Sequence, residues 1–185
     1  GAGPDHARRA RAHRARCPGG DAPAGSGRDW LAQQLQAMEV PNPTVVLLDA
    51  PPLPAPLAQQ ALAAQWPQLE VMEDDVLFLP DYVEHKAVVD AYLAQRSGQW
   101  DVFVGLVAIM HPDTRVLGVE RQGGLVFVTI DRMMSMVHNT YAPTALRLLA
   151  QWDETNTDPE TNTIDRYLQT RQQLRVVTTL PFLVG

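Results

Sequence analysis

The stretch that decides the fold is Leu69-Glu70-Val71-Met72-Glu73-Asp74-Asp75-Val76, a short apolar run that ends in three adjacent carboxylates. A buried strand that stops on such a cluster places the carboxylates at the carboxyl end of a sheet, where open α/β sheets bind ligands. Adjacent carboxylates repel one another unless a proton or a cation intervenes. Mg²⁺ and Mn²⁺ prefer such oxygen ligands and often bridge them to a substrate phosphate. The cluster therefore indicates a metal-dependent enzyme that acts on a nucleotide sugar or another phosphate compound.

The same cluster has a second interpretation as a solvated acidic turn at the start of a helix. Asp and Glu near a helix N-terminus interact favourably with the helix dipole. Structural ion networks also contain acidic clusters of this kind. The spacing alone leaves both interpretations open.

Outside this stretch, apolar periodicity predicts strands that alternate with helices in the first half of the chain. Strands are expected at 44–48, 69–72, 100–106, 115–119, 125–130, 136–141 and 174–180, and helices at 30–38, 57–65, 80–95, 143–152 and 164–172. Gly123-Gly124 between two strand-like runs predicts a hairpin. This order predicts an α/β fold with a mixed, mostly parallel sheet and helices on both faces.

Two further expectations concern buried residues. The first is a buried apolar stripe along the helix expected at 80–95, and the second is a structural role for one histidine. The stripe consists of Tyr82, Val83, Val89, Tyr92 and Leu93. The five histidines of the chain show no metal-ligand spacing, and His138 is expected to be structural.

The length of 185 residues fits one domain preceded by a tail. Residues 1–28 are rich in Arg, Ala, Gly and Pro and contain no aromatic or branched aliphatic residue, so we expect them to be disordered. They hold six Arg against two Asp, a balance of +4, whereas residues 29–185 hold nine Lys or Arg against nineteen Asp or Glu, a balance of −10. An acidic domain lacks the basic patch that nucleic-acid binding needs, so no nucleic-acid partner is expected.

The composition also bears on the cellular compartment. No apolar run approaches the roughly 20 residues that span a bilayer, so no transmembrane segment is expected. Cys17 is the single cysteine, which rules out an intrachain disulfide and fits a reducing compartment. We therefore expect a cytoplasmic protein.

The acidic stretch and four further segments resemble a known enzyme family. Residues 72–78, followed by Pro80-Asp81-Tyr82, resemble the acidic signature of glycosyltransferase family 25, which includes lipooligosaccharide and collagen galactosyltransferases. In the same order as in that family, segments 28–35, 100–105, 140–149 and 163–168 resemble its arginine-marked first helix, a strand, a strand-to-helix element and a later motif. The family's first strand and its Cys- and His-containing segment have no counterpart here. We therefore expect residues 29–185 to form one incomplete domain of a truncated or diverged member.

The resemblance implies a glycosyltransferase A-like fold with Mn²⁺ or Mg²⁺ on the diphosphate of a UDP-sugar. It assigns Glu73 and Asp75 to the metal, or to the ribose and the metal between them. Asp74, as a second ligand or as a partner of the ligands, and Arg28 would contribute to binding the cofactor and the donor. Such a metal neutralises the charge that develops on the departing UDP. The expected reaction moves a hexose to a saccharide acceptor with inversion. The alternative is a catalytically inactive remnant that acts as a binding or interaction module.

An inverting transfer needs a general base that takes the proton of the acceptor hydroxyl. The resemblance favours Asp165 for this role, with Asp153 and Glu160 as fallbacks. Asp165 also fits the first turn of a helix begun by Thr163, where it would stabilise the helix by about 0.3–1 kcal/mol. Both roles remain open for Asp165 at this point.

Overall fold

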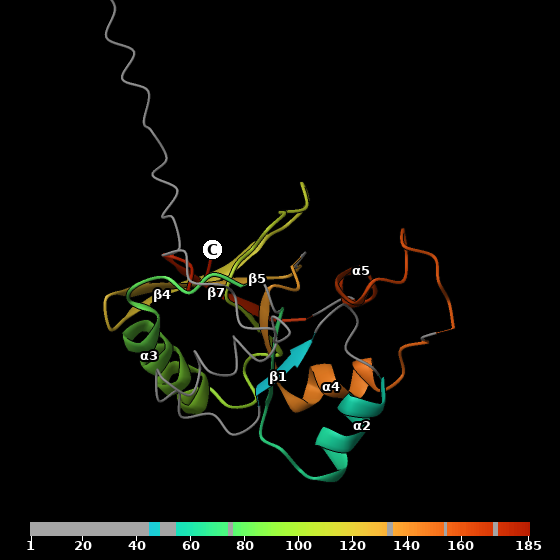
Figure 1. Ribbon diagram of the computed structural model, residues 1–185. Coiled ribbons are helices and arrows are strands. Elements are labelled where there is room, and N and C mark those ends of the chain that lie inside the picture. Colours follow the sequence, from blue (N-terminus) through green and yellow to red (C-terminus); the bar gives the residue numbers. More distant parts are fainter. Residues whose placement is uncertain (1–44, 49–54, 74–75, 133–134, 154, 172–173) are drawn as a thin grey trace, which may run out of the picture.

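The computed structural model describes residues 55–73, 76–132, 135–153, 155–171 and 174–185, together with the backbone of 45–48. A seven-stranded sheet in the order β1-β2-β6-β3-β7-β5-β4 forms its centre, and helices cover the sheet (Figure 1). The strands are β1 (Val45–Leu48), β2 (Leu69–Glu73), β3 (Val102–Val104), β4 (Val116–Gln122), β5 (Leu125–Ile130), β6 (His138–Tyr141) and β7 (Val176–Leu180). The helices are α2 (Ala55–Ala63), α3 (Tyr82–Gln95), α4 (Pro143–Leu149) and α5 (Ile164–Gln169). No described helix is both long and apolar enough to cross a bilayer.

The expected α/β class is confirmed, but the expectation of a mostly parallel sheet is wrong for neighbouring strands. Only β1–β2 and β3–β7 pair in parallel, whereas β2–β6, β6–β3, β7–β5 and β5–β4 pair antiparallel. Helical connections make β1, β2 and β3 run in the same direction, as the alternating pattern predicts. The pattern does not reveal that β6, from much later in the chain, inserts between β2 and β3.

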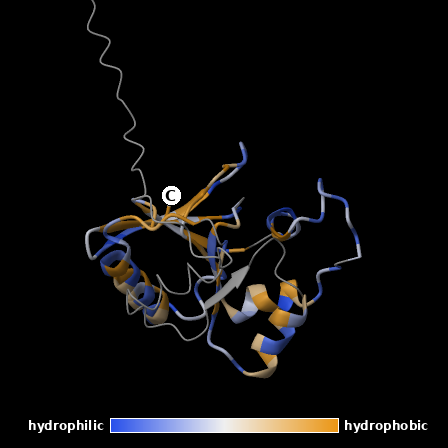
Figure 2. Cartoon of the chain, viewed as in Figure 1, coloured by the Kyte–Doolittle hydropathy of each residue, from blue (hydrophilic) through white to orange (hydrophobic). Residues whose placement is uncertain are grey.

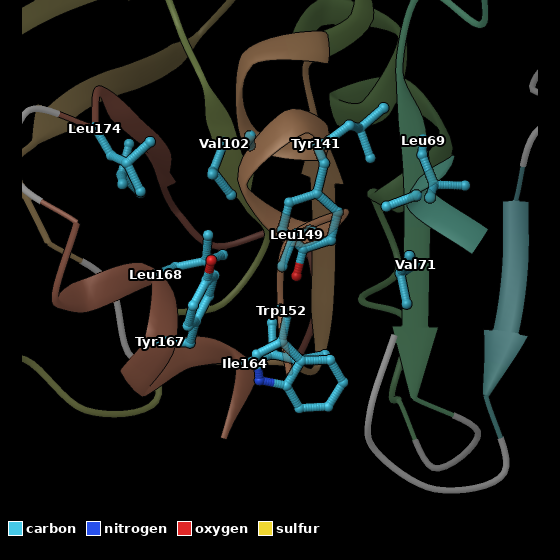
Figure 3. Packing of buried hydrophobic residues seen from close by; sticks show 14 of the residues in the cluster. Leu69, Val71, Val102, Tyr141, Leu149, Trp152, Ile164, Tyr167, Leu168 and Leu174 are labelled. Carbon is cyan, nitrogen blue, oxygen red and sulfur yellow. The ribbon is translucent and has the colours of Figure 1, made fainter. Parts of the chain in front are cut away.

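Helices lie on both faces of the sheet, as expected. Successive side chains of a strand point to opposite faces. In β3, Val102 belongs to the apolar cluster formed with α2, α4 and α5, whereas Phe103 belongs to the cluster formed with α3. Figure 3 shows the first cluster, to which α4 contributes Leu149 and α5 contributes Tyr167. The sheet thus separates two apolar cores.

Helix α3 is fastened to the β4–β5 hairpin by stacked rings and a shared carboxylate. The rings of Tyr92 and Phe127 stack with centroids 3.7 Å apart. The Tyr92 hydroxyl donates to Oε1 of Glu120 at 2.9 Å, and Arg96 pairs with the same carboxylate. Burial and the bond to Glu120 raise the pKa of Tyr92 to about 12. These contacts fix the helix against the sheet.

The hairpin predicted at Gly123-Gly124 is confirmed. The two glycines have φ angles of +56° and +83°, a region that L-residues with a Cβ avoid. A tight turn that continues the right-handed twist of two antiparallel strands needs such angles at both central positions. The chemistry of these two glycines therefore sets the register of β4 against β5.

Candidate functional site

A cavity of about 570 Å³ opens at the edge of the sheet where β2 and β3 end and β6 begins. It is the edge at which the acidic stretch was expected to deliver its carboxylates. Glu73 from β2, Ala108 after β3 and Met136 before β6 line its inner side. Trp152 after α4 and Asp165 of α5 line it from the helical layer.

Glu73 is the last residue of β2, and its backbone is held in place. Its amide donates to the carbonyl oxygen of Val137 at 3.0 Å, which continues the pairing of β2 beyond the start of β6. The Glu73 side chain is half-buried and lines the cavity. The predicted position of this carboxylate at the carboxyl end of a strand is confirmed.

Asp165 lies in the first turn of α5 and lines the same cavity. Its Oδ1 accepts a hydrogen bond from the Thr163 hydroxyl at 2.6 Å and another from the Arg166 amide at 2.8 Å. Asp165 therefore makes hydrogen bonds at the start of α5, and it also lines the cavity.

The buried hydroxyl of Tyr141 lies close enough to both carboxylates to respond to their charge. Burial raises the pKa of Tyr141 above its ordinary value, and the negative charges of Asp165 and Glu73 raise it further. A hydrogen bond from the Asn139 amide, at 3.0 Å, acts in the opposite direction. The charges of two carboxylates that were predicted separately from the sequence thus raise the pKa of one buried hydroxyl.

The outer wall of the cavity is a polar loop that one asparagine holds together. Nδ2 of Asn162 donates to the carbonyl oxygens of Asp153 at 2.7 Å and Asn156 at 2.6 Å. Its Oδ1 accepts a hydrogen bond from the indole of Trp152 at 3.0 Å. Figure 2 shows this loop as a mostly hydrophilic segment beyond α4. The helices expected at 143–152 and 164–172 leave a connecting segment between them, but the sequence gives no signal for the organising role of Asn162.

Two aspartates of this loop use their oxygens to shape it. Asp158 lines the cavity and accepts hydrogen bonds from the Thr161 hydroxyl at 2.7 Å and the Glu160 amide at 2.9 Å. The bond from Thr161 contributes most to holding the pKa of Asp158 below its ordinary range. Bonds from Thr155 lower the pKa of Asp153 in the same way. The fallback candidates Asp153 and Glu160 do not line the cavity, in contrast to Asp165.

Ser135 is a cavity residue that the sequence did not indicate. It is 4% exposed, and its hydroxyl has no hydrogen-bond partner among the described residues. A lone serine between two apolar segments carries no recognisable motif. In the fold, its hydroxyl oxygen is itself buried, so Ser135 contributes to the wall without exposing that oxygen to the cavity.

The remaining predicted site residues lie outside the described residues: Arg28, Asp74 and Asp75. Within the described ranges, no group of three or more His, Cys, Asp or Glu side chains could hold a metal ion. Glu73 is the one described member of the acidic cluster. The metal site therefore stays a prediction.

His138 lies on the opposite face of the sheet, in the structural position expected for it. It is fully buried, and its Nε2 lies 2.8 Å from Oε1 of Glu70 and 3.4 Å from the Tyr82 hydroxyl. The backbone of Gly105 packs directly against its ring. This histidine belongs to the core beneath α3 rather than to the cavity.

A scan against protein-family models gives no match for this chain, and a search of curated protein sequences gives none. The interpretation of the cavity therefore depends on its residues and their geometry.

Proposed function

We propose that the chain is a metal-dependent glycosyltransferase that moves a hexose from a UDP-sugar to a saccharide acceptor with inversion. The observation that supports this most is that Glu73 and Asp165 line one cavity. Its volume of about 570 Å³ lies within the range of small-molecule sites. The proposal keeps the resemblance to glycosyltransferase family 25, with a glycosyltransferase A-like arrangement and action in the cytoplasm.

In this proposal the donor binds at the carboxyl end of β2. Glu73 and Asp75 would hold Mn²⁺ or Mg²⁺, with Asp74 and Arg28 contributing to binding the donor. Glu73, the member of this set that the structure describes, suits such an ion because Mn²⁺ and Mg²⁺ prefer carboxylate oxygen ligands. When bound, the metal would stabilise the charge on the departing UDP.

Asp165 would act as the general base on the acceptor. The Thr163 hydroxyl and the Arg166 amide hold its Oδ1, which fixes the orientation of the carboxylate. The proton of the acceptor hydroxyl would therefore pass to Oδ2 as the sugar is attacked. Apolar side chains such as Met136 and Trp152 offer surfaces for the C–H faces of sugar rings.

A catalytically inactive binding module is the second candidate. The observation that favours it is that the hydrogen bonds of Asp165 are those of a residue that stabilises a helix start. A saccharide would then occupy the cavity without being transferred. The two candidates differ in turnover rather than in binding.

Turnover of UDP-galactose and UDP-glucose in the presence of Mn²⁺ tests the proposal. The parent should release UDP, and a positioned base contributes about 10²–10⁴-fold, so Asp165→Asn should lower the rate by that factor. Glu84→Gln, an exposed carboxylate on α3, is the matched control and should leave the rate unchanged. A parent that binds UDP but releases none from either donor would favour the binding module. Equal rates for parent and Asp165→Asn would overturn the assignment of the base.

A further inference from the structure

A second, larger cavity of about 1050 Å³ lies at the other end of α5. The start of α5 lines the cavity described above, whereas Gln169, Thr170 and Arg171 at its end line this one. The remaining walls come from the segment before β4, the start of β4 and the residues after β5. A helix of six residues, about 9 Å long, therefore separates the two cavities.

This cavity has a formal excess of one positive charge among its arginines and aspartates. Arg115, Arg132 and Arg171 line it against Asp113 and Asp131. Residues 29–185 as a whole carry a balance of −10, so a cavity with an excess of arginine departs from the general charge of the domain. A local excess of positive charge favours the approach of an anion.

The first arginine contacts one aspartate through both its side chain and its backbone amide. Nε of Arg115 lies 2.8 Å from Oδ2 of Asp131, and its backbone amide donates to Oδ1 of the same carboxylate at 2.8 Å. These bonds keep the pKa of Asp131 below its ordinary range. The Arg115 side chain is 76% exposed, so its outer edge remains accessible.

The second arginine lies beside a histidine. Nη1 of Arg132 lies 3.3 Å from Nδ1 of His111 and 3.9 Å from the Asp113 carboxylate. The same Nδ1 accepts a hydrogen bond from the Asp113 amide at 3.1 Å. A neutral His111 therefore carries its proton on Nε2, where it is a further donor.

The third arginine is held by an aromatic ring. The guanidinium carbon of Arg171 lies 4.4 Å from the centroid of the Tyr167 ring. This contact orients the guanidinium without using its N–H groups on a carboxylate. The three arginines thus have separate anchors and face one cavity.

We propose that this cavity binds the phosphate group of a ligand. The planar guanidinium fork matches phosphate oxygens, and orienting it beforehand reduces the entropy lost on binding. Two sources of the group are possible, a soluble phosphate ester or a phospholipid headgroup. Exposed apolar side chains favour the second source. Leu117 lines the cavity and is 53% exposed, and Met110 and Val116, which are next in sequence to His111 and Arg115, are both 60% exposed. The inference is independent of the proposed glycosyltransferase activity.

Calorimetric titration of the full chain with inorganic phosphate tests the proposal. Saturable binding is expected, weakened at least tenfold in Arg132→Gln and in Arg171→Gln. Arg147→Gln, an exposed arginine on α4, is the control and should bind as the parent does. Circular dichroism checks that each variant is folded, and Arg132→Lys keeps the charge if Arg132→Gln does not fold.

Vesicles distinguish the two sources. One set contains phosphatidylglycerol in phosphatidylcholine and the other contains phosphatidylcholine alone. Binding to the first set that depends on Arg132 and Arg171 would support a phospholipid headgroup, whereas binding of inorganic phosphate alone would support a soluble ester. The proposal is overturned if the parent binds neither probe, or if the Arg132 and Arg171 variants bind as tightly as Arg147→Gln.

Discussion

Glu73 and Asp165 line the same cavity, although one ends the second strand of the sheet and the other begins a helix that follows the sixth strand. Burial raises the pKa of the Tyr141 hydroxyl most, and the negative charges of both carboxylates raise it further. Two carboxylates in one cavity can have different chemical roles, because the surroundings of each carboxylate determine its protonation and its partners. In the proposed reaction, Glu73 would help to hold the metal that binds the donor, and Asp165 would take the proton of the acceptor hydroxyl.

The only lysine of the chain, Lys86, is a buried residue of α3, and its removal should strongly destabilise the fold. Nζ of Lys86 lies 3.3 Å from Oε2 of Glu70 and 2.6 Å from Oδ1 of Asp90. Lys86→Met leaves the buried Glu70 carboxylate without this cation, which should cost about 3–5 kcal/mol in the free energy of unfolding. Urea unfolding measures the loss.

The double variant Lys86→Met, Glu70→Gln provides the control for that loss. Because it removes both buried charges together, it should recover part of the stability lost in Lys86→Met. A change of less than about 1 kcal/mol in Lys86→Met would show that the ion pair is not a significant part of this core.

Gly105→Ala should destabilise the protein because its new methyl group would meet the ring of His138. The ideal Cβ position lies 2.9 Å from Cγ of that ring, closer than real carbon atoms approach. Overpacking of this kind costs about 1–3 kcal/mol. Gly118→Ala is a matched control, since a Cβ there meets nothing within 4 Å. Equal thermal unfolding of the two variants would contradict the account of this contact.

Asn162→Ala should loosen the outer wall of the first cavity without unfolding the domain. The variant loses the amide bonds to the carbonyl oxygens of Asp153 and Asn156. Amide hydrogen exchange should accelerate in residues 155–163 and stay unchanged in β3 and β7. Unchanged exchange in the loop would mean that other contacts are sufficient to order it.

Acid should weaken the fold through the loop aspartates. The folded-state pKa values of Asp153 and Asp158 lie below the ordinary value of 3.8, so their contribution is present above that pH and is lost as the pH falls through the folded values. Asp90 acts in the opposite sense because burial raises its pKa, so its contribution is lost as the pH rises through its folded value. Urea unfolding between about pH 6 and about pH 3 should show a smaller acid loss in the double variant Asp153→Asn, Asp158→Asn. An identical loss in parent and variant would refute this origin of the acid sensitivity.

Local patterns predicted the parts of the fold that depend on neighbouring residues. The apolar run before Glu73 and the turn at Gly123-Gly124 are both confirmed. The buried stripe of α3 is only partly as predicted, because Val83 is 44% exposed and Lys86 is buried in its place. Helical periodicity of apolar residues does not mark a lysine for burial, whereas in the fold Glu70 on β2 provides the buried Lys86 with a partner carboxylate.

Features that depend on distant contacts were not predictable. The insertion of β6 between β2 and β3 joins segments far apart in the chain, and no local periodicity encodes it. The roles of Ser135 and Asn162 likewise arise only when the loop, α4 and β6 meet at the cavity. Asp165 was found through a resemblance between sequences, and its hydrogen bonds alone would have indicated only a helix start.

Calorimetric titration of UDP into the protein, with and without Mn²⁺, tests the central claim most directly. The parent, Glu73→Gln and Asp75→Ala are compared, with Glu84→Gln as the exposed control. The account predicts that UDP binds only with Mn²⁺ and that both site variants weaken binding at least tenfold, while the control binds as the parent does. Binding of UDP that is equally tight without the metal, or in Glu73→Gln and Asp75→Ala, would contradict the claim that this edge of the sheet is a metal-dependent donor site.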